Sequence, residues 1–281
     1  MKGAISRYRD RGLRNVIKYS FLRFHSVRTG VSTCKALVRG RHYPSATAGS
    51  GILAGYDPDE ITQQIRNRSY FEGFSLPADT VRKIQAFANE TPCHARIEDR
   101  RVSFLPHEHQ ATEEKLGKPI IIADYRASDC EAIQNLERDP GVAEIARCYF
   151  GYRHGRIFTR LHWSFVCDAD PAQRREAKQT INFHYDLHAS RFIYFNFYLT
   201  DVDVTGGPHV LVRGSHGRKS LASTMWSSNR SDASVARAYG EQNITTICGP
   251  AGYGFVEDHF CYHKATIPTN KNRLMMMIHV S

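Results

Sequence analysis

The residues that could do chemistry are concentrated in the short run Asn182–His188, which holds two histidines and one aspartate. On extended backbone alternate side chains share a face, so His184 and Asp186 point the same way and could bind one metal ion. A third ligand has to come from elsewhere in the chain. His263 is the best candidate, because it follows the strand-like run 253–262. The spacing therefore predicts a metal site built from two histidines and one carboxylate.

A second feature says which kind of metal site this is. Two histidines and a carboxylate on one side of a metal form the facial triad of non-haem Fe(II) oxygenases, which leaves the opposite positions open. Arg273 stands ten residues after His263 on the next strand-like run. A dicarboxylate cosubstrate bound to iron needs a fixed cation at its far end, and a guanidinium can hold that carboxylate through two hydrogen bonds. We therefore expect Arg273 to bind a cosubstrate.

Other histidines lie close to these in the sequence. His188 shares the alternating face with the first two ligands, so it could be a fourth ligand, a partner of a ligand or a substrate contact. We expect it at the mouth of the pocket. His259 is the rival distal ligand, because it precedes His263 by an even offset on the same strand-like run. His209 and His216 lie in a turn-forming stretch and are expected to be structural.

The elements that position these residues differ between the two halves of the chain. Helical periodicity covers 59–68, 77–89 and 129–149, the last broken near Asp139-Pro-Gly, with one strand over 118–124. Farther on, β-branched and aromatic residues between turn residues predict strands over 156–167, 180–185, 192–199, 210–213, 244–248, 253–257 and 273–280. Helices followed by short strands predict a mainly β, α+β fold, an antiparallel sandwich or barrel that carries helices on one side.

Several motifs stand in a fixed order along the chain. They are His184-Tyr-Asp186, Leu199-Thr-Asp201, the run 206–216 that ends in Gly-Ser-His, the run Gly252–Lys264, and Arg273. In this order they resemble the phytanoyl-CoA dioxygenase family of Fe(II)/2-oxoglutarate-dependent oxygenases, with its His-x-Asp, its stretch ending in Pro-Gly-Ser-His, its distal histidine strand and its cosubstrate arginine. The likeness covers about residues 57–281.

The resemblance implies a double-stranded β-helix of the jelly-roll type with flanking helices. It implies a dioxygenase that uses Fe(II), 2-oxoglutarate and O₂ to hydroxylate or desaturate a substrate, with release of succinate and CO₂. The roles it implies are iron binding by His184, Asp186 and His263, and 2-oxoglutarate binding by Arg273, with Asn196 and Tyr198 as further cosubstrate contacts. Departures from the family pattern at Gly206, Arg213 and Gly252-Tyr253 change loops and remove no ligand.

A basic N-terminal arm lies outside the likeness. Residues 1–41 hold 11 basic residues and one acid, whereas residues 42–281 hold 27 of each sign. We therefore divide the chain into an arm and linker, 1–56, and an oxygenase domain, 57–281. The pattern of Leu13–Phe24 predicts a short basic amphipathic helix, which packs on the domain or lies on an anionic membrane surface. The neutral body argues against nucleic acid as a partner.

The rest of the composition bears on location and substrate. The seven cysteines form no Cys-x-x-Cys pair, and no apolar run reaches the roughly 20 residues of a membrane span. We expect a cytoplasmic protein, peripheral to the inner membrane face if the arm binds lipid. The substrate is expected to be a small molecule or a lipid-linked or sugar-linked one, and nothing in the motifs identifies it further.

The alternative hypothesis is a jelly-roll protein that binds metal without catalysis, or one that uses Zn or Mn at the same triad. Arg273 argues against it, because a metal store needs no cation for a cosubstrate. Succinate formation from 2-oxoglutarate distinguishes the two.

Overall fold

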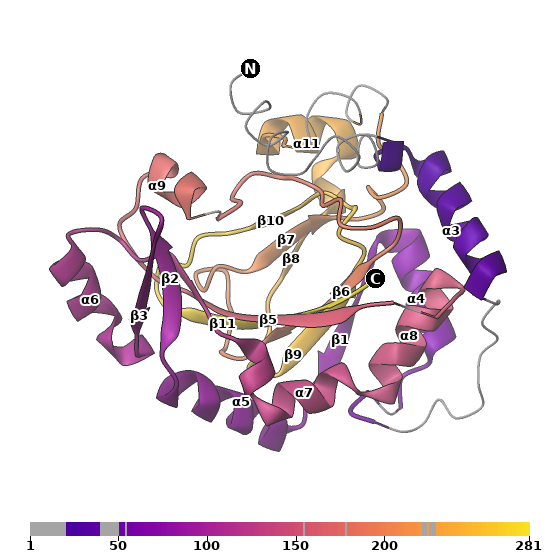
Figure 1. Ribbon diagram of the computed structural model, residues 1–281. Coiled ribbons are helices and arrows are strands. Elements are labelled where there is room, and N and C mark those ends of the chain that lie inside the picture. The colour runs from indigo at the N-terminus through magenta and orange to yellow at the C-terminus, as the bar shows by residue number, and fades with distance from the viewer. Residues whose placement is uncertain are drawn as a thin grey trace.

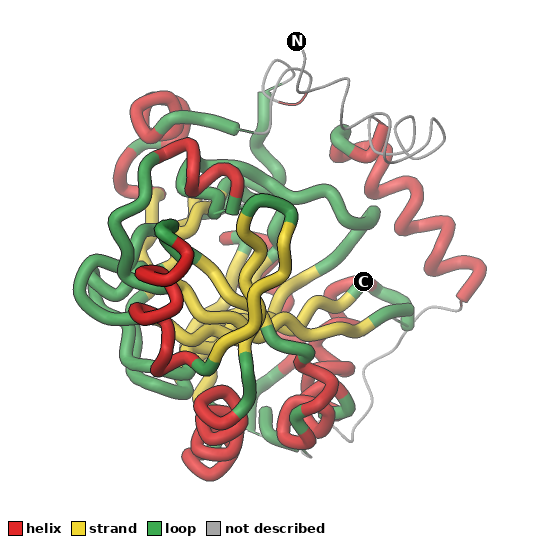
Figure 2. The backbone as a smooth tube through the Cα atoms, turned by 60° about the vertical axis from the view of Figure 1, so that its left-hand side comes forward, coloured by secondary structure: helices red, strands yellow, loops and turns green. Residues whose placement is uncertain are grey.

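Two antiparallel sheets form the centre of the protein in its computed structural model, which describes residues 21–39, 51–53, 55–153, 155–177, 179–220, 224 and 229–281 (Figure 1, Figure 2). The larger sheet has the strand order β1 (Tyr70–Ser75), β9 (Tyr253–Glu257), β6 (Ile193–Tyr198), β11 (Arg273–Val280), β5 (Ile157–Ser164), β4 (Ile122–Asp124), β2 (Cys93–Ile97) and β3 (Arg100–Phe104). The smaller sheet has the order β10 (His263–Ala265), β7 (His209–Val212) and β8 (Ile244–Ile247). The protein therefore has the mainly β, α+β jelly-roll fold that the sequence predicts.

Apolar side chains between the sheets explain why the sheets face each other. Tyr198 in β6 and Met275 in β11 pack with Leu211 in β7 and Ile247 in β8, and all four are almost fully buried. Successive residues of a strand point to opposite faces, so Met276 joins a different core on the other side of the larger sheet. Burial of both faces favours the nearly continuous apolar sequence of β11.

Helices cover the outer face of the larger sheet. Figure 1 shows α4, α5, α7 and α8 along that face, away from the smaller sheet. The helices of the described residues are α3 (His25–Arg39), α4 (Pro58–Arg68), α5 (Ala78–Glu90), α6 (His109–Leu116), α7 (Glu131–Glu137), α8 (Pro140–Phe150), α9 (Pro171–Glu176) and α11 (Asp232–Tyr239). None of them combines the length and the apolar character needed to cross a bilayer.

Most of the predicted elements occur close to their expected positions. The predicted helices at 59–68 and 77–89 are α4 and α5, and the helical stretch 129–149 divides into α7 and α8. The division falls at Asp139, whose carboxylate accepts the backbone N–H groups of Gly141 and Val142 and so caps α8, while Pro140 occupies its first turn. Six of the seven strands predicted after residue 156 are also present, as β5, β6, β7, β8, β9 and β11.

Two strand predictions are wrong in ways that matter for the site. Residues 180–185 form no strand and make only isolated bridges at Phe183 and His184. The run expected to extend over 253–262 ends at Glu257, and His263 begins β10 in the other sheet. A period-two sequence pattern continues through a turn as readily as through a strand, so it does not show where pairing stops. The strand predicted over 118–124 is shorter than expected and is confined to β4.

The structure describes only part of the N-terminal region. The helix expected at Leu13–Phe24 and the linker expected at 46–55 lie largely outside the described residues. The described helix in this region is α3, whose Arg28 and Ser32 side chains are buried against the body of the protein. Lys35 of the same helix donates to the Ser190 hydroxyl at 3.0 Å. The division into an arm and a domain at residue 56 stays a prediction.

The segment 258–263, called the distal loop below, joins β9 to β10 and carries two of the site histidines. Buried charged side chains stabilise this loop. The Asp258 carboxylate accepts the backbone N–H of Phe260 at 2.9 Å, and the Arg28 guanidinium lies 3.2 Å from the centre of the Phe260 ring. The Lys219 ammonium donates to the Phe260 carbonyl oxygen. Helix α3 therefore contributes directly to the support of this loop.

The buried position of the Lys219 ammonium generates a prediction about stability. Burial lowers the pKa of Lys219 to about 7, from its ordinary value of 10.5. Between these values the unfolded chain binds a proton at Lys219 that the folded chain lacks, so this group makes the free energy of unfolding rise with pH across that window. The slope is at most about 1.4 kcal/mol per pH unit. Below about pH 7 the folded chain also binds this proton, so burial of the charged ammonium lowers the free energy of unfolding by its full amount.

Denaturant unfolding of the wild type and Lys219→Met between pH 6.5 and 10.5 measures this contribution. The wild type should gain stability relative to the variant as the pH rises. Lys83→Met, which alters an exposed lysine paired with Asp79, is the control and should run parallel to the wild type. A constant difference between wild type and Lys219→Met at every pH would contradict the prediction.

Candidate metal centre

A short backbone pairing brings the three predicted ligands together. The N–H of His184 donates to the carbonyl of His263 at 2.9 Å, and the N–H of His263 donates to the carbonyl of His184 at 2.8 Å. Asp186 continues this pairing, because its N–H donates to the carbonyl of His259 at 2.9 Å. Directly opposed residues of an antiparallel pair have adjacent side chains, and the His184 and His263 rings lie 4.3 Å apart.

The ligand atoms of the triad are arranged for one small cation. His184, Asp186 and His263 each offer one atom, and these atoms all lie within 4.8 Å of one another. The Nδ1 atoms of the two histidines lie 3.1 Å from the carbonyl oxygens of Asn182 and Cys261, respectively. Because a carbonyl oxygen can only accept, each Nδ1 carries its hydrogen and each Nε2 keeps a lone pair for a metal.

The electrostatic surroundings keep these side chains in the protonation states that a metal requires. Burial lowers the pKa of His184, and it lowers that of His263 well below the ordinary value, so both rings are neutral. Burial acts to raise the pKa of Asp186, but contacts with His188 and His259 outweigh it and hold this pKa well below its usual range. A neutral pair of imidazoles and an ionised carboxylate are the forms that bind metal ions.

His259, the rival distal ligand, has a different position from the one expected. It lies in the distal loop and not on a strand. Its Nδ1 lies 3.2 Å from Asp186 Oδ2, within hydrogen-bond distance, whereas the Nε2 of His263 lies 3.9 Å from the same oxygen. An N–H that donates to the carboxylate fixes its orientation and is not available as a ligand. The geometry therefore favours His263 in the triad and His259 as the partner of Asp186.

Of the two histidines expected to be structural, one lies outside the cavity lining and the other lines the cavity. His216 joins distant segments, with Nδ1 2.7 Å from the Ser69 hydroxyl and Nε2 3.1 Å from the Arg66 carbonyl oxygen, as a structural residue would. His209 instead lines the same cavity as the triad, and its Nε2 lies 2.7 Å from Glu257 Oε2. The pairing of His209 with Glu257 joins two strands in different sheets, which the sequence pattern does not reveal.

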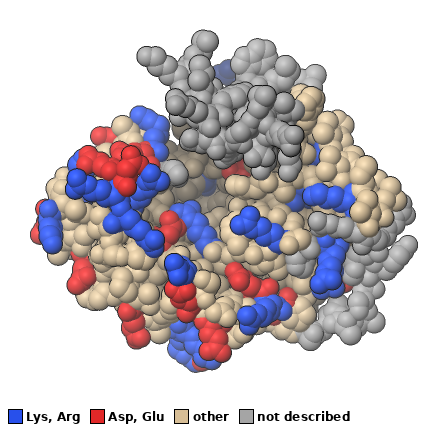
Figure 3. All heavy atoms as spheres, viewed as in Figure 1, with Lys and Arg blue, Asp and Glu red and all other residues tan. Residues whose placement is uncertain are grey.

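The triad lies in a cavity of about 370 Å³ between the two sheets. Figure 3 shows the surface hollowed above the middle of the molecule, between the sheets as they are placed in Figure 1. Strand alternation supplies much of the wall: β5 contributes Phe158, Arg160, His162 and Ser164, and β11 contributes Arg273, Met275 and Met277. The cavity thus combines a metal-ligand set, a cation and apolar side chains.

Arg273 is a buried cation without an acidic partner in the described part of the chain. Its side chain is nearly inaccessible, at 3% exposure, and it lines the cavity. Nη1 donates to the Gly207 carbonyl oxygen and Nη2 to the Ser164 hydroxyl at 3.1 Å, while Nε has no hydrogen-bond partner. A buried charge is costly unless an opposite charge compensates it, so this guanidinium indicates a site for an anion.

The turn at Gly207 explains how Arg273 is held. Gly207 has a positive φ of 73°, and a Cβ there would lie 2.9 Å from the backbone nitrogen of Pro268. Only glycine fits this turn without strain, and the turn directs the Gly207 carbonyl at the guanidinium. The expectation that Gly207 serves a backbone turn therefore agrees with the structure.

Asn196 and Tyr198, the other expected cosubstrate contacts, do not line the cavity. Asn196 is fully buried in β6. The Tyr198 hydroxyl donates to the Ile247 carbonyl at 2.8 Å and accepts the backbone N–H of His209 at 2.8 Å, so it ties the two sheets together. Their contact with a cosubstrate stays a prediction that this geometry does not support. The residue of β6 that does line the cavity is Tyr194.

His188 lines the cavity and is about half exposed. Its side chain is 49% exposed and its Nε2 lies 3.6 Å from Asp186 Oδ2. Its ring also contacts Phe192, Tyr194 and His279. This position allows contact both with the triad carboxylate and with a substrate that enters the cavity.

Sequence reasoning missed several residues of the cavity wall. They are His162, Ser164 and Tyr194, together with the cavity position of His209, whose buried partner Glu257 was also missed. The first two lie at every second position with Phe158 and Arg160 in β5, so alternation along the predicted strand 156–167 could have revealed them. His162 is also buried, and its Nδ1 has no hydrogen-bond partner.

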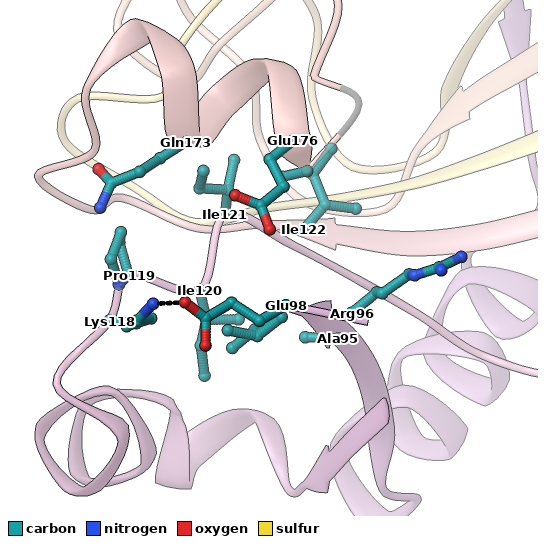
Figure 4. Close-up of a pocket in the computed structure, with 12 residues that line it drawn as sticks. Ala95, Arg96, Glu98, Lys118, Pro119, Ile120, Ile121, Ile122, Gln173 and Glu176 are labelled. Carbon is teal, nitrogen blue, oxygen red and sulfur yellow. Dashed lines mark ion pairs between the residues drawn. The ribbon is translucent and has the colours of Figure 1, made fainter. Parts of the chain in front are cut away.

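A second, smaller depression lies between β2, the segment 118–122 and α9 (Figure 4). The ion pair Lys118–Glu98 crosses it, and the Glu176 and Gln173 side chains of α9 point toward it from the opposite wall. Both clusters of potential metal ligands that occur among the described residues lie elsewhere, around His263. This depression therefore adds no metal chemistry to the site between the sheets.

Comparison with known proteins gives a structural likeness and no sequence match. No protein-family model matches the chain, and no curated protein sequence matches it. The epimerase SnoN, solved in complex with Fe³⁺, α-ketoglutarate and nogalamycin RO, is similar with a TM-score of 0.52 and 16% identity, over 79% of this chain and 82% of that chain.

Two other solved structures are similar to the same extent. The non-haem α-ketoglutarate-dependent carbocyclase SnoK from nogalamycin biosynthesis has a TM-score of 0.51 and 14% identity, over 83% of this chain and 86% of that one. EctD from S. alaskensis has a TM-score of 0.52 and 15% identity, over 87% of this chain and 81% of that one. The chain therefore shares the fold of structurally characterised α-ketoglutarate-dependent non-haem enzymes.

Proposed function

We propose that the protein is an Fe(II)/2-oxoglutarate-dependent dioxygenase, a member of the group that includes the phytanoyl-CoA dioxygenase family. Its substrate would be a small molecule or a lipid-linked or sugar-linked one, hydroxylated with release of succinate and CO₂. The observation that carries the proposal is Arg273, a buried guanidinium without an acidic partner among the described residues that lines the same cavity as the His184, Asp186 and His263 triad.

The residues present fit the metal and the cosubstrate. The triad has two neutral imidazoles whose Nε2 atoms are free and one ionised carboxylate, which suits a divalent non-haem metal. The orphaned Nε of Arg273 and the neighbouring Ser164 hydroxyl suit a carboxylate. A dicarboxylic keto acid satisfies both sets at once, because it offers a chelating end to the metal and a carboxylate to Arg273.

When bound, Fe(II), 2-oxoglutarate and O₂ supply the oxidation that replaces a C–H hydrogen of the substrate with a hydroxyl group, while 2-oxoglutarate becomes succinate and CO₂. The chain's own side chains orient the reactants. His184, Asp186 and His263 would hold the metal, and Arg273 would hold the far carboxylate of the cosubstrate. Met275 and Met277 contribute apolar side chains to the cavity wall beside these groups.

The substrate would approach from the part of the cavity opposite Arg273. His188 and Phe158 are partly exposed there, and Arg160 is paired with Asp124 at 2.5 Å. These groups offer an imidazole, an aromatic face and a charged pair. They support a substrate that carries polar groups beside the reacting carbon and leave its identity open.

The alternative of a metal-binding jelly roll without catalysis, or of a Zn or Mn enzyme at the same triad, makes no use of Arg273. Burial of an uncompensated guanidinium would then reduce stability for no purpose. Anaerobic addition of Fe(II) and 2-oxoglutarate to the protein distinguishes these hypotheses, because joint binding at the triad produces a visible metal-to-ligand absorption band. A succinate-coupled screen of metabolites would follow.

Substitution of the triad tests the metal assignment. His184→Ala and Asp186→Ala should each abolish turnover and the absorption band, because each removes one of three ligands. Circular dichroism and thermal unfolding should show that the fold survives, since both side chains lie at the cavity and not in the apolar core. Full activity in either variant would refute the assignment.

Substitution of Arg273 tests the cosubstrate assignment separately. Arg273→Ala should chiefly raise the KM for 2-oxoglutarate, by the ~2–4 kcal/mol of a lost charged hydrogen-bond pair, which corresponds to roughly 30-fold to 900-fold. Metal binding in the absence of 2-oxoglutarate should be unchanged. Arg160→Ala, which removes a nearby arginine already paired with Asp124, is the matched control. An equal KM for 2-oxoglutarate in wild type and Arg273→Ala would exclude this role.

A further inference from the structure

Glu257 is a completely buried carboxylate behind the triad. It ends β9, just before the distal loop, and its exposed fraction is 0%. Its Oε2 lies 2.7 Å from His209 Nε2 and 3.8 Å from His259 Nε2, and its Oε1 lies 3.5 Å from His263 Nδ1. The Cys261 thiol donates to Oε1 at 3.0 Å. One carboxylate thus contacts three imidazoles of the site.

The charge on Glu257 requires an explanation. Burial of a carboxylate is unfavourable unless nearby groups compensate it, and the ion-pair partners of Glu257 within the described ranges are all histidines. This carboxylate therefore lies in the core beside a site built for a cation, with imidazoles as its ion-pair partners.

We infer that Glu257 is a positioning residue for the metal centre. The N–H at His263 Nδ1 faces both the Cys261 carbonyl oxygen, at 3.1 Å, and Glu257 Oε1. This fixes the tautomer and the ring orientation that direct Nε2 at the metal. The same carboxylate holds His209 at the cavity wall. Partners of this kind behind a metal-bound imidazole strengthen metal binding by 10-fold to 100-fold.

Glu257, Cys261 and His263 could also be regarded as a second metal site, because their ligand atoms lie close together. The contacts oppose this. The Cys261 sulfur donates its hydrogen to Glu257 Oε1 at 3.0 Å, as a thiol does and a metal-bound thiolate does not. The His263 nitrogen on that side faces a carbonyl oxygen and carries a hydrogen. These groups therefore support the triad from behind.

This inference rests on the proposed function only in requiring that the triad bind a divalent metal, so Co²⁺ alone can test it. Glu257→Gln keeps the size of the side chain and removes its charge. We expect its Kd for Co²⁺ to rise by about 10-fold to 100-fold, with a changed ligand-field absorption spectrum, since His263 and His209 lose the negative charge beside them. The matched control is Glu144→Gln, which neutralises a buried carboxylate of α8 paired with Arg147. Its Kd and spectrum should equal those of the wild type.

The outcomes separate the two proposals. Wild-type affinity and spectrum in Glu257→Gln would overturn the positioning role and leave the proposed function intact. Absence of Co²⁺ binding by the wild type, or unchanged binding in His184→Ala, would overturn both. Should Glu257→Gln fail to fold, Glu257→Asp carries the test, because withdrawal of the carboxylate by one methylene group from His263 should also weaken Co²⁺ binding and shift the spectrum.

Helix α3 supports a second, independent inference, because large apolar side chains are exposed on it and just before it. Arg28, Ser32 and Lys35 face the body of the protein, where Arg28 packs on Phe260 and Lys35 donates to Ser190. The exposed large apolar side chains of the described residues are seven, and four of them belong to this region. They are Phe21, Val31, Leu37 and Val38, with exposed fractions of 59%, 37%, 66% and 86%. We call Val31, Leu37 and Val38, together with Phe21 just before the helix, the outer face of α3.

We propose that the outer face of α3 docks on an anionic lipid bilayer. Apolar side chains on one face of a helix insert at the boundary between head groups and acyl chains. Basic residues near such a helix attract it to anionic lipid, and residues 1–41 hold nine of them besides Arg28 and Lys35, against one acid. An excess of one sign beside an uncharged apolar face favours a bilayer over a second copy of the chain, which would bring like charges together.

Point substitutions test this more sharply than removal of the arm, because the arm includes Leu22 and Arg28, which are buried against the body. The full chain is sedimented with vesicles of phosphatidylglycerol and phosphatidylcholine, or of phosphatidylcholine alone. The wild type should bind the anionic vesicles more strongly, and 0.5 M salt should reduce that binding. A double variant, Leu37→Ser with Val38→Ser, should lose about tenfold in affinity, with unchanged Co²⁺ binding and thermal stability.

The matched control is Val204→Ser, which alters a valine of 76% exposure outside α3 and should bind vesicles like the wild type. Equal losses in the control and the double variant would overturn the proposal, as would wild-type binding that is absent or indifferent to lipid charge. Size-exclusion chromatography is run in parallel. A dimer that the double variant dissociates, together with unchanged vesicle binding, would assign the face to a second copy of this chain and refute the bilayer.

Discussion

The reciprocal hydrogen bonds between the backbones of His184 and His263 constrain the whole site. They join a segment that forms no regular strand to the first residue of β10, and they place two imidazole rings side by side. Everything else near the triad either maintains this pairing or uses it. The distal loop must turn within a few residues to bring His263 opposite His184, and the support from Asp258, Arg28 and Lys219 holds that turn in place.

Two buried charges of opposite sign complement this geometry. Glu257 lies beside His263, one of the residues proposed to bind a cation. Arg273 lies on the cavity wall, where an anionic cosubstrate is proposed to bind. Each would be costly in an empty apolar core, because neither has a counter-charge of the usual kind among the described residues. A metal ion and a dicarboxylate would provide the missing charges. The buried charges of Glu257 and Arg273 are therefore opposite in sign to the metal ion and the dicarboxylate that the protein is proposed to bind.

The N-terminal region connects the site to the outside of the molecule. Arg28 and Lys35 of α3 turn inward to the distal loop and to Ser190, whereas apolar side chains of the same helix are exposed. Because these two charged side chains contact the body of the protein, α3 stabilises the distal loop as well as covering the domain. It supports the distal loop and also presents an exposed surface, so the proposed contact with a membrane would involve the same helix that supports the candidate site. Figure 3 shows, by contrast, basic and acidic side chains interspersed over the visible body, in line with the balanced charge of residues 42–281.

The sequence by itself determined the fold class, most strand and helix positions, and the residue types of the triad and of Arg273. These depend on local periods and on short motifs, which a linear pattern preserves. Only the tertiary structure decided which histidine opposes His184, where Glu257 and His209 meet, and that the Tyr198 hydroxyl is occupied by backbone groups. The physical reason is that these contacts join strands of different sheets through turns. The strand pattern of the sequence gives the face of each side chain, but the distance between two faces is set by how the sheets pack.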